Sequence, residues 1–522
     1  MQTENCMASS RTFWYLLIAA AVLLFIRLGA TTVFQVAEGR NAQCAAEMLA
    51  GDGIVPMFNG KLRTDKPPVH YYMMMLAYSV AGKSEGASRF FSAIAGILIV
   101  LGTWWITRRH FSTKAATISA LVLLSSVHFL FQFRLATPDP FLILAHVFAL
   151  FAFWEGYATK NKRWYYAMYA MMGLAVFAKG PVGLALPGST IFFFLLFRRE
   201  LNWKTILSLQ PLIGIFIFAL VALPWYWLVH EATDGAWTRG FFFEHNVSRF
   251  NAAVDGHKGP FFLPLVFVLA GLFPFSVFMP MASIDAWKKK AVVPFLFFML
   301  LSAIFIIVPY SFSSTKLINY TSPAYPFVAI LIGAYLSTLR MPKALNIQLL
   351  ILGIITLLFP IGFVIWVKSD KLPELLPQIW MVFLLPIAAV GAWFLYRQKK
   401  SEQWWLWLAG GSMLFNMLFF AWLFPLLDQT GSVKKLSGVV RDAPDMVAYK
   451  RMNDAFVYYH QKSIPVLPAV AEVKQVLDQH PKTLVLQLGK IPDLKDSIPE
   501  LTLIHDEKDL FSSQHTFIYQ KK

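Results

Sequence analysis

Residues 288–310 read KKKAVVPFLFFMLLSAIFIIVPY, three consecutive lysines followed by twenty residues that carry no charged side chain. A helix of about twenty apolar residues is long enough to cross the hydrocarbon core of a bilayer. Clustered lysines at one end of such a helix stay on the cytoplasmic side. The stretch therefore predicts a spanning helix that enters the membrane from the cytoplasm.

Similar apolar runs recur along most of the 522-residue chain, which is 57% hydrophobic and contains 48 Phe and 17 Trp. This composition excludes a soluble globular protein and predicts an all-α polytopic membrane protein. We expect about 13 transmembrane helices, at residues 12–31, 87–106, 115–132, 137–156, 163–178, 181–197, 206–229, 260–281, 291–310, 320–338, 346–367, 378–396 and 404–425.

One further apolar segment, Pro67–Gly82, is short and opens with two prolines. If it crossed the membrane, Arg108 and Arg109 after the next run would lie outside, against the rule that positive loops stay cytoplasmic. We therefore expect a re-entrant or interfacial helix in this segment.

Lysine and arginine gather in alternate gaps between the runs, which predicts a cytoplasmic N-terminus. Residues 428–522 carry nearly balanced charge, so most of the net charge of +17 belongs to the membrane part. There it predicts contacts with anionic membrane lipids and no nucleic-acid partner. The clusters are Arg108, Arg109, Lys114; Lys160, Lys162, Arg163; Arg198, Arg199, Lys204; Lys288, Lys289, Lys290; Arg340, Lys343; and Arg397, Lys399, Lys400.

An odd number of spans places the C-terminal tail outside the cytoplasm. We expect two domains: a transmembrane domain at 1–425, with long outer loops at 32–86 and 230–259, and a soluble extracytoplasmic domain at 426–522. The tail is polar and aperiodic at first. Its later pattern predicts a small α/β domain, with strands at Ala455–Tyr459, Thr483–Leu488 and Thr516–Tyr519 and a helix around Ala469–Gln479.

Motifs of soluble enzymes and of metal sites are absent from the sequence. Cys6 and Cys44 flank the first span on opposite sides and cannot pair. Gly82-Lys83-Ser84 ends like a phosphate-binding loop, but Ala77 stands where the first glycine belongs. No metal-ligand spacing occurs, and we expect no cofactor. Asn319-Tyr320-Thr321 matches a glycosylation sequon, a match too short to carry weight.

Ionisable residues gather instead at the expected outer ends of the helices. Taken singly, each has an ordinary explanation, such as a lysine that reaches the headgroups, a helix cap or a surface ion pair. Together they favour function, because charged groups between membrane helices are costly. They occur in Glu38-Gly39-Arg40-Asn41, Asp65-Lys66-Pro67-Pro68, Arg134 to Asp139, Lys179-Gly180-Pro181, Glu244-His245-Asn246 with Arg249, and Ser313-Ser314-Thr315-Lys316 with Tyr320.

These segments, with Glu47-Met48-Leu49 and Phe58-Asn59-Gly60, resemble a known superfamily over about residues 31–340. It comprises the polyprenyl-phosphate-dependent glycosyltransferases that include protein O-mannosyltransferases and lipid A aminoarabinose transferases, which have the GT-C membrane fold. The resemblance implies an inverting transfer of a sugar from a polyprenyl-phosphate donor to a lipid A, glycan or protein acceptor. It further implies the outer face of a bacterial inner membrane and leaves metal dependence open.

Such a transfer needs a carboxylate for the acceptor and fixed cations for the departing phosphate. The family usually has an Asp-Glu pair at the start of the first outer loop, but here the Asp position is Ala37. The resemblance therefore implies Glu38 or Asp139 as the base or acceptor positioner, with loss of catalysis as a third possibility. It implies that Asp65 orients Lys66. Donor phosphate would be bound by Lys66, Lys179, Arg249 and Tyr320, and the pocket lined by Arg40, Arg134, His245 and Lys316.

Two other classes of protein fit the same layout. A lipid-linked-sugar transporter or flippase is also polytopic and basic inside, but it would place ionisable groups near mid-bilayer, often in two related halves. A non-catalytic assembly subunit would explain Ala37 and the outer domain. The position of the ionisable groups at one edge favours the glycosyltransferase.

Overall fold

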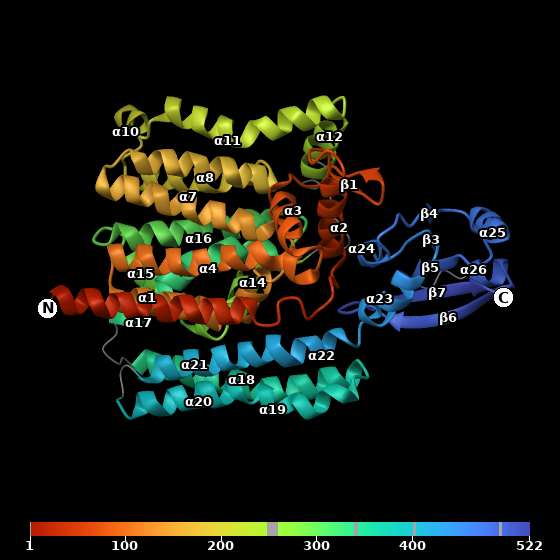
Figure 1. The fold of residues 1–522 in the computed structure, drawn as a ribbon. Coiled ribbons are helices and arrows are strands. Elements are labelled where there is room, and N and C mark those ends of the chain that lie inside the picture. The colour runs from red at the N-terminus through yellow and green to blue at the C-terminus, as the bar shows by residue number, and fades with distance from the viewer. Residues whose placement is uncertain (1, 248–258, 339–342, 400–402, 490–492) are drawn as a thin grey trace. The chain divides into compact units, whose positions relative to one another are not determined.

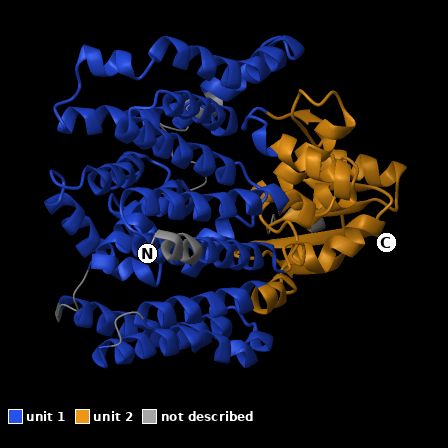
Figure 2. Ribbon diagram, turned by 60° about the vertical axis from the view of Figure 1, so that its left-hand side comes forward, with its two compact units in different colours: residues 1–26, 64–70, 90–420 blue, residues 27–63, 71–89, 421–522 orange. Residues whose placement is uncertain are grey.

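A computed structural model describes residues 2–247, 259–338, 343–399, 403–489 and 493–522. The chain divides into two compact units (Figure 2). Unit 1 contains residues 1–26, 64–70 and 90–420, and unit 2 contains residues 27–63, 71–89 and 421–522. The first predicted outer loop is thus grouped largely with the C-terminal tail.

Unit 1 is a bundle of long helices (Figure 1). Every predicted apolar run coincides with a helix or with a helix broken into shorter pieces. Within the described residues, seven segments are both long and apolar enough to cross a membrane. The runs correspond to α1 (Gln2–Phe25), α4 (Glu85–His110), α5 (Thr113–Ser125) with α6 (Val127–Gln132), α7 (Asp139–Thr159), α8 (Arg163–Lys179), α9 (Val182–Phe197), α11 (Pro211–Ala232), α14 (Leu263–Gly271) with η2 (Phe275–Phe278) and α15 (Met279–Lys288), α16 (Pro294–Phe312), α17 (Tyr325–Thr338), α18 (Lys343–Ser369), α19 (Ile379–Val382) with α20 (Leu384–Arg397), and α21 (Gln403–Leu418) with η5 (Phe419–Leu423) and α22 (Phe424–Asp428).

Short polar residues break some of these runs. Ser126 leaves helical geometry between α5 and α6, and its hydroxyl accepts a hydrogen bond from the backbone N–H of Phe129. A serine in this position caps the next helix and so favours a new start over continuation. The apolar run 115–132 therefore forms two helices, α5 and α6, in place of one.

The first outer loop forms compact local structure in unit 2. It contains the helix α2 (Val36–Ala50), and the helix expected in Pro67–Gly82 is present as α3 (Val69–Ala81). Between them, β1 (Met57–Phe58) and β2 (Lys61–Leu62) form a hairpin. Asn59 and Gly60 make its two-residue turn with φ of +56° and +71°, the left-handed pair that favours Asn-Gly.

The C-terminal tail forms the predicted α/β arrangement around a five-stranded sheet. The strand order is β4-β3-β5-β7-β6, with β3, β4 and β5 parallel and β7 and β6 antiparallel. Buried apolar clusters line it. Its elements are α23 (Ser432–Asp442), β3 (Met446–Tyr449), α24 (Ala455–His460), β4 (Val466–Leu467), α25 (Val470–Gln479), β5 (Leu484–Leu488), α26 (Asp493–Ser497), β6 (Leu501–Lys508) and β7 (His515–Lys521).

Two sequence-based expectations about the tail were wrong. Ala455–Tyr459 is not a strand but the helix α24, because its aromatic and β-branched residues are buried on all sides and tertiary packing overrides their strand propensity. The polar start of the tail is not aperiodic either. Val433, Leu436 and Val440 recur at helical spacing and are the buried face of α23.

The first loop packs intimately on the tail within unit 2. A Cβ at Gly39 would lie 2.6 Å from the Cα of Ala455, so only glycine fits between α2 and α24. The side chain of Asn59 pairs with the backbone of Ile464, accepting from its N–H at 2.7 Å and donating to its carbonyl at 2.8 Å. Phe58-Asn59-Gly60 therefore joins this loop to the C-terminal sheet.

Candidate active site

A buried ion pair joins the end of α8 to the start of α7 in unit 1. Lys179 is the last residue of α8 and donates to Oδ1 of Asp139, the first residue of α7. Their side chains are only 12% and 9% exposed. Pro138 is the N-cap residue of α7, and Pro140 lies in its first turn, where a missing backbone N–H is tolerated. Two charges in such a position are costly unless each has partners.

Residues from η3 (Ile318–Ala324) and α16 complete this group. Asn319 donates from Nδ2 to Oδ2 of Asp139 at 3.0 Å. The ammonium group of Lys179 lies 4.9 Å from the centroid of the Tyr320 ring, and the Tyr310 ring lies 5.1 Å from the Tyr320 ring. We call Asp139, Lys179, Asn319, Tyr320 and Tyr310 the acid–lysine cluster. Its cation faces a carboxylate and an electron-rich ring face.

The turn after Lys179 packs on the second predicted outer loop, also in unit 1. Gly180 has φ +84° and ψ −155°, and a Cβ there would lie 2.6 Å from Cζ of Phe241. This backbone region is essentially restricted to glycine. Phe241 belongs to η1 (Gly240–Val247), a π-helix. Irregular turns of this type are frequent at functional sites.

The Asp65-Lys66 segment meets the same π-helix. A Cβ at Gly240 would lie 2.7 Å from the hydroxyl oxygen of Thr64, so the Thr64 side chain packs directly against the Gly240 backbone. Asp65 and Lys66 follow Thr64 in a half-buried bend. The start of η1 thus contacts both the Lys179-Gly180 turn and the Thr64 segment, which are more than one hundred residues apart in sequence.

Of the remaining predicted site residues in the second loop and the last turn, only Lys316 has a described side chain. His245 lies on η1, and its side chain is outside the described structure, as is Arg249. Lys316 donates to the carbonyl of Ser313 at 2.7 Å. A Cβ at Gly259 would lie 3.5 Å from the Lys316 stem, so the end of the second loop reaches this lysine.

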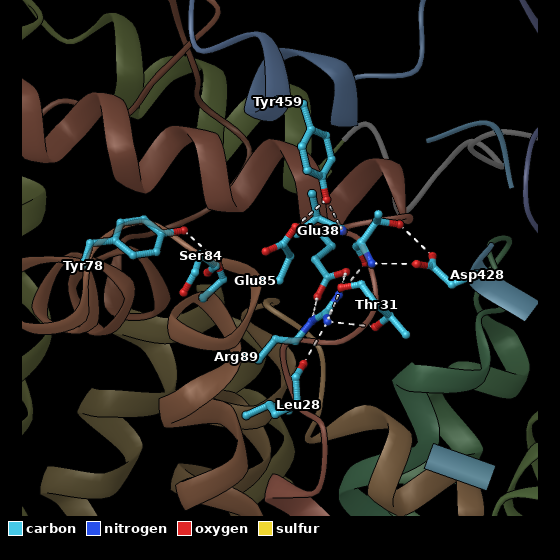
Figure 3. Close-up of polar contacts among 12 residues, drawn as sticks. Leu28, Thr31, Glu38, Tyr78, Ser84, Glu85, Arg89, Asp428 and Tyr459 are labelled. Atoms are coloured by element: carbon cyan, nitrogen blue, oxygen red, sulfur yellow. Dashed lines mark hydrogen bonds and ion pairs between the residues drawn. The ribbon is translucent and has the colours of Figure 1, made fainter. Parts of the chain in front are cut away.

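Glu38, one of the two predicted bases, lies in unit 2 and forms a bidentate ion pair with Arg89 (Figure 3). Arg89 donates from Nε to Oε1 at 2.7 Å and from Nη2 to Oε2 at 2.9 Å. The two side chains are 0% and 2% exposed. Arg89 also donates to the carbonyls of Leu28, Thr31 and Thr32. The Glu38–Arg89 ion pair therefore holds the first loop against the start of α4.

Other buried polar contacts add to this ion pair within unit 2 (Figure 3). Asp428 accepts from the backbone N–H and hydroxyl of Thr32 at 2.9 and 2.6 Å. The Tyr459 hydroxyl donates to Glu85 at 2.9 Å and accepts from the N–H of Val33 at 3.1 Å. Burial raises the pKa of Tyr459, so it stays a neutral donor. The network holds residues 28–38 in one conformation.

Two predicted pocket residues also have structural partners. Arg40 pairs with Asp454 in unit 2. Arg134, in unit 1, donates to the carbonyls of Leu23 and Ile26 at 2.9 and 2.7 Å, at the C-terminal end of α1. A guanidinium group in this position satisfies carbonyls that the helix leaves unpaired. Neither contact involves the acid–lysine cluster.

Sequence reasoning missed three residues of these sites. In the sequence, Asn319 stands out only as part of a sequon, and Tyr310 lies within an apolar run. Arg89 stands alone among the apolar residues of its run, and such an isolated charge was a signal that could have been used. Among the described residues, no group of three His, Cys, Asp or Glu side chains is arranged to hold a metal ion.

Known proteins resemble this chain over much of its length. The sequence profile of the dolichyl-phosphate-mannose-protein mannosyltransferase family matches residues 65–227, which include Asp65, Lys66, Asp139 and Lys179. An undecaprenyl phosphate-alpha-4-amino-4-deoxy-L-arabinose arabinosyl transferase of Edwardsiella ictaluri is 30% identical over 358 residues, which are 67% of this chain and 63% of that protein. The chain belongs to the superfamily of polyprenyl-phosphate-dependent glycosyltransferases. The predicted resemblance is thereby confirmed.

A further relative and two solved structures also resemble this chain. The corresponding transferase of Yersinia pestis is 26% identical over 408 residues, 74% of this chain and 72% of that protein. The crystal structure of ArnT from Cupriavidus metallidurans bound to undecaprenyl phosphate shares the fold, with a TM-score of 0.81 over 97% of both chains at 19% identity. The archaeal oligosaccharyltransferase AglB from Archaeoglobus fulgidus matches with a TM-score of 0.52 at 12% identity, over 92% of this chain and 69% of that chain.

Proposed function

We propose that this protein is an inverting glycosyltransferase that moves a sugar from a polyprenyl-phosphate donor to a lipid acceptor. The observation that carries the proposal is the acid–lysine cluster, in which a buried carboxylate and a buried ammonium group meet at the ends of two apolar helices. The names of the relatives support an undecaprenyl-phosphate carrier and an aminoarabinose-like pentose.

In the proposed reaction an acceptor oxygen attacks the anomeric carbon as the bond from that carbon to the phosphate oxygen breaks. The departing polyprenyl phosphate takes up the electron pair, and its negative charge is stabilised by Lys179, with Lys66 and Arg249 as further cations. Tyr320 positions Lys179 through its ring. Attack from the face opposite the phosphate inverts the anomeric centre.

We assign the acceptor proton to Asp139 rather than to Glu38. Each oxygen of Glu38 already accepts a charge-assisted bond from Arg89, and the pair is buried. Asp139 instead has one charged partner, Lys179, and one neutral partner, Asn319, and its side chain is 9% exposed where that of Glu38 is 0% exposed. Asp139 therefore takes over the task of the family Asp that Ala37 replaces.

The charge pattern supports an extracytoplasmic site in a bacterial inner membrane. Lys160 and Lys162 lie in the connection between α7 and α8, and Arg163 begins α8. All three are at the opposite end of these helices from Asp139 and Lys179. Since positive connections stay cytoplasmic, the acid–lysine cluster faces the other side. The N-terminus is then cytoplasmic and the C-terminal sheet extracytoplasmic.

The acidic residues of α7 argue against the transporter alternative. Glu155 is the second acid of this helix and pairs with His110 at 2.6 Å and Arg109 at 3.0 Å. It lies 16 residues from Asp139, about 24 Å along the helix, so the two acids are at opposite ends. A transport site would instead place ionisable groups near the middle of the bilayer.

Purified protein in vesicles, given a radiolabelled polyprenyl-phosphate sugar and an acceptor lipid, tests the proposal. We expect label to move from donor to acceptor. Label that crosses the vesicle membrane on its original carrier would indicate a flippase. Label that does neither, in protein shown to bind the donor, would indicate a non-catalytic subunit.

A further inference from the structure

The turn between β6 and β7 holds a large aromatic side chain in the open. Phe511 is 65% exposed, and its φ of +58° is one that bulky L-residues rarely adopt. The turn is nevertheless well tied to the sheet. Asp509 accepts from Thr516 at 2.7 Å and from Asn453 at 3.0 Å. A strained, exposed aromatic residue on a firmly held turn points to a contact outside the chain.

The Phe511 ring lies against the end of the last apolar segment, within unit 2. It stacks on Phe424 with 6.5 Å between ring centroids and meets Phe34 edge-on at 6.0 Å. Phe424 is near the end of Gln403–Asp428, one of the seven segments able to cross a membrane. Phe511 therefore packs at the C-terminal end of an apolar segment that is able to cross a membrane.

Two other exposed side chains, Trp422 and Arg27, lie near the same end of this apolar segment. Trp422 is 53% exposed and lies two residues before Phe424. Arg27, also exposed, donates to the carbonyl of Ala421 at 2.8 Å. Tryptophan gathers at the boundary between headgroups and acyl chains, and arginine at the end of a span reaches the lipid phosphates.

We propose that Phe511 inserts into the headgroup region of the bilayer and anchors the C-terminal sheet to the lipid surface. The partner is the lipid surface because the Phe511 ring stacks on Phe424, near the end of a segment that is able to cross a membrane. Ser512 and Ser513 beside it can hydrogen-bond to headgroups. The anchor is independent of the proposed glycosyl transfer, since none of its residues belongs to the acid–lysine cluster.

Spin labels in the full-length protein test this contact. In a Cys6→Ser background, where Cys44 is buried, labels are attached at Phe511→Cys and, separately, at Ser513→Cys, which keeps the ring. Lys522→Cys is the matched control, because β7 carries the chain about 20 Å from the turn before it reaches this residue. Each variant is reconstituted in phosphatidylethanolamine–phosphatidylglycerol vesicles.

We expect labels at 511 and 513 to collide several-fold more often with oxygen, which concentrates in lipid, than with a water-soluble nickel complex. The label at 522 should show the reverse preference. Labels at both turn positions that behave like the label at 522 would overturn the proposal. Shielding of these labels from both reagents would overturn it too, because it would indicate a protein partner.

Discussion

Asn319 donates a hydrogen bond to Oδ2 of Asp139, which is 180 residues away in sequence, while Lys179 donates to the other carboxylate oxygen, Oδ1. The acid is thereby fixed by one neutral and one charged partner. A fixed carboxylate beside a fixed cation suits a reaction in which a proton and a phosphate must be handled at neighbouring positions. Lys179 is the last residue of α8, and Asn319 lies in the short helix η3.

Breaking the Glu38–Arg89 pair should destabilise the protein without selectively removing transfer. Glu38→Gln leaves a buried guanidinium group without its counter-ion, which costs about 3–5 kcal/mol. We expect a clearly lower Tm in detergent, and transfer per folded molecule within a few-fold of wild type. Differential scanning fluorimetry and the vesicle assay measure the two quantities.

The double variant Glu38→Gln, Arg89→Met is the control for this pair. It removes both charges, so it should recover part of the Tm lost in the single variant. A Glu38→Gln protein that has the wild-type Tm but transfers no sugar would contradict this structural role and would indicate that Glu38 is the base.

Lys179→Met should weaken donor binding. A hydrogen bond to a charged group contributes about 1.5–3 kcal/mol, so we expect the Kd for a short-chain polyprenyl phosphate to rise roughly 10- to 150-fold. Titration calorimetry in detergent measures it. Lys179→Arg keeps the positive charge, so its Kd should rise less than that of Lys179→Met. An unchanged Kd in Lys179→Met would show that this lysine does not bind the donor phosphate.

Gly180→Ala should impair the site through the backbone. Alanine at φ +84° and ψ −155° costs about 1–3 kcal/mol, and its Cβ would collide with the Phe241 ring. We expect a lower Tm and slower transfer. Gly188→Ala in α9 is the matched control, since no atom lies within 4 Å of its added Cβ. Equal Tm values and equal transfer rates in Gly180→Ala and Gly188→Ala would show that the turn at Gly180 can shift without loss of function.

Lys83 should make stability depend on pH in the alkaline range. Burial lowers its pKa from 10.5 to about 8, against the opposing charges of Glu47 and Glu85. Between pH 8 and 10.5 the unfolded chain binds more protons at this residue than the folded one, so its contribution to stability grows as pH rises. The Tm of wild type relative to Lys83→Met should therefore increase from pH 7.5 to 9.5. A constant difference would contradict the lowered pKa.

Much of the fold could be predicted because the bilayer imposes a simple rule on composition. The run 291–310 coincides with α16, and the other apolar runs coincide with helices as well. Breaks inside runs were not predictable from hydropathy, since a single serine, Ser126, ends α5. Ala455–Tyr459 was predicted as a strand because short apolar segments have no period that separates the two structures.

The site was predictable in part. Asp139, Lys179 and Tyr320 could be named because each stands at a helix end in a recognisable motif, and the structure brings these three together. Their arrangement could not be predicted, because it depends on contacts between distant turns. The choice between Glu38 and Asp139 likewise required knowledge of Arg89, whose partner lies 51 residues away.

The most direct test of the account is the rate of sugar transfer by Asp139→Asn in vesicles, measured in a single turnover with saturating polyprenyl-phosphate sugar. Asparagine keeps the size of the side chain but cannot accept a proton, so we predict a rate per folded molecule at least about 100-fold below wild type. The Tm should fall as well, because the Lys179 ammonium loses its counter-ion. Transfer by folded Asp139→Asn at the wild-type rate would contradict the assignment of the reaction to the acid–lysine cluster.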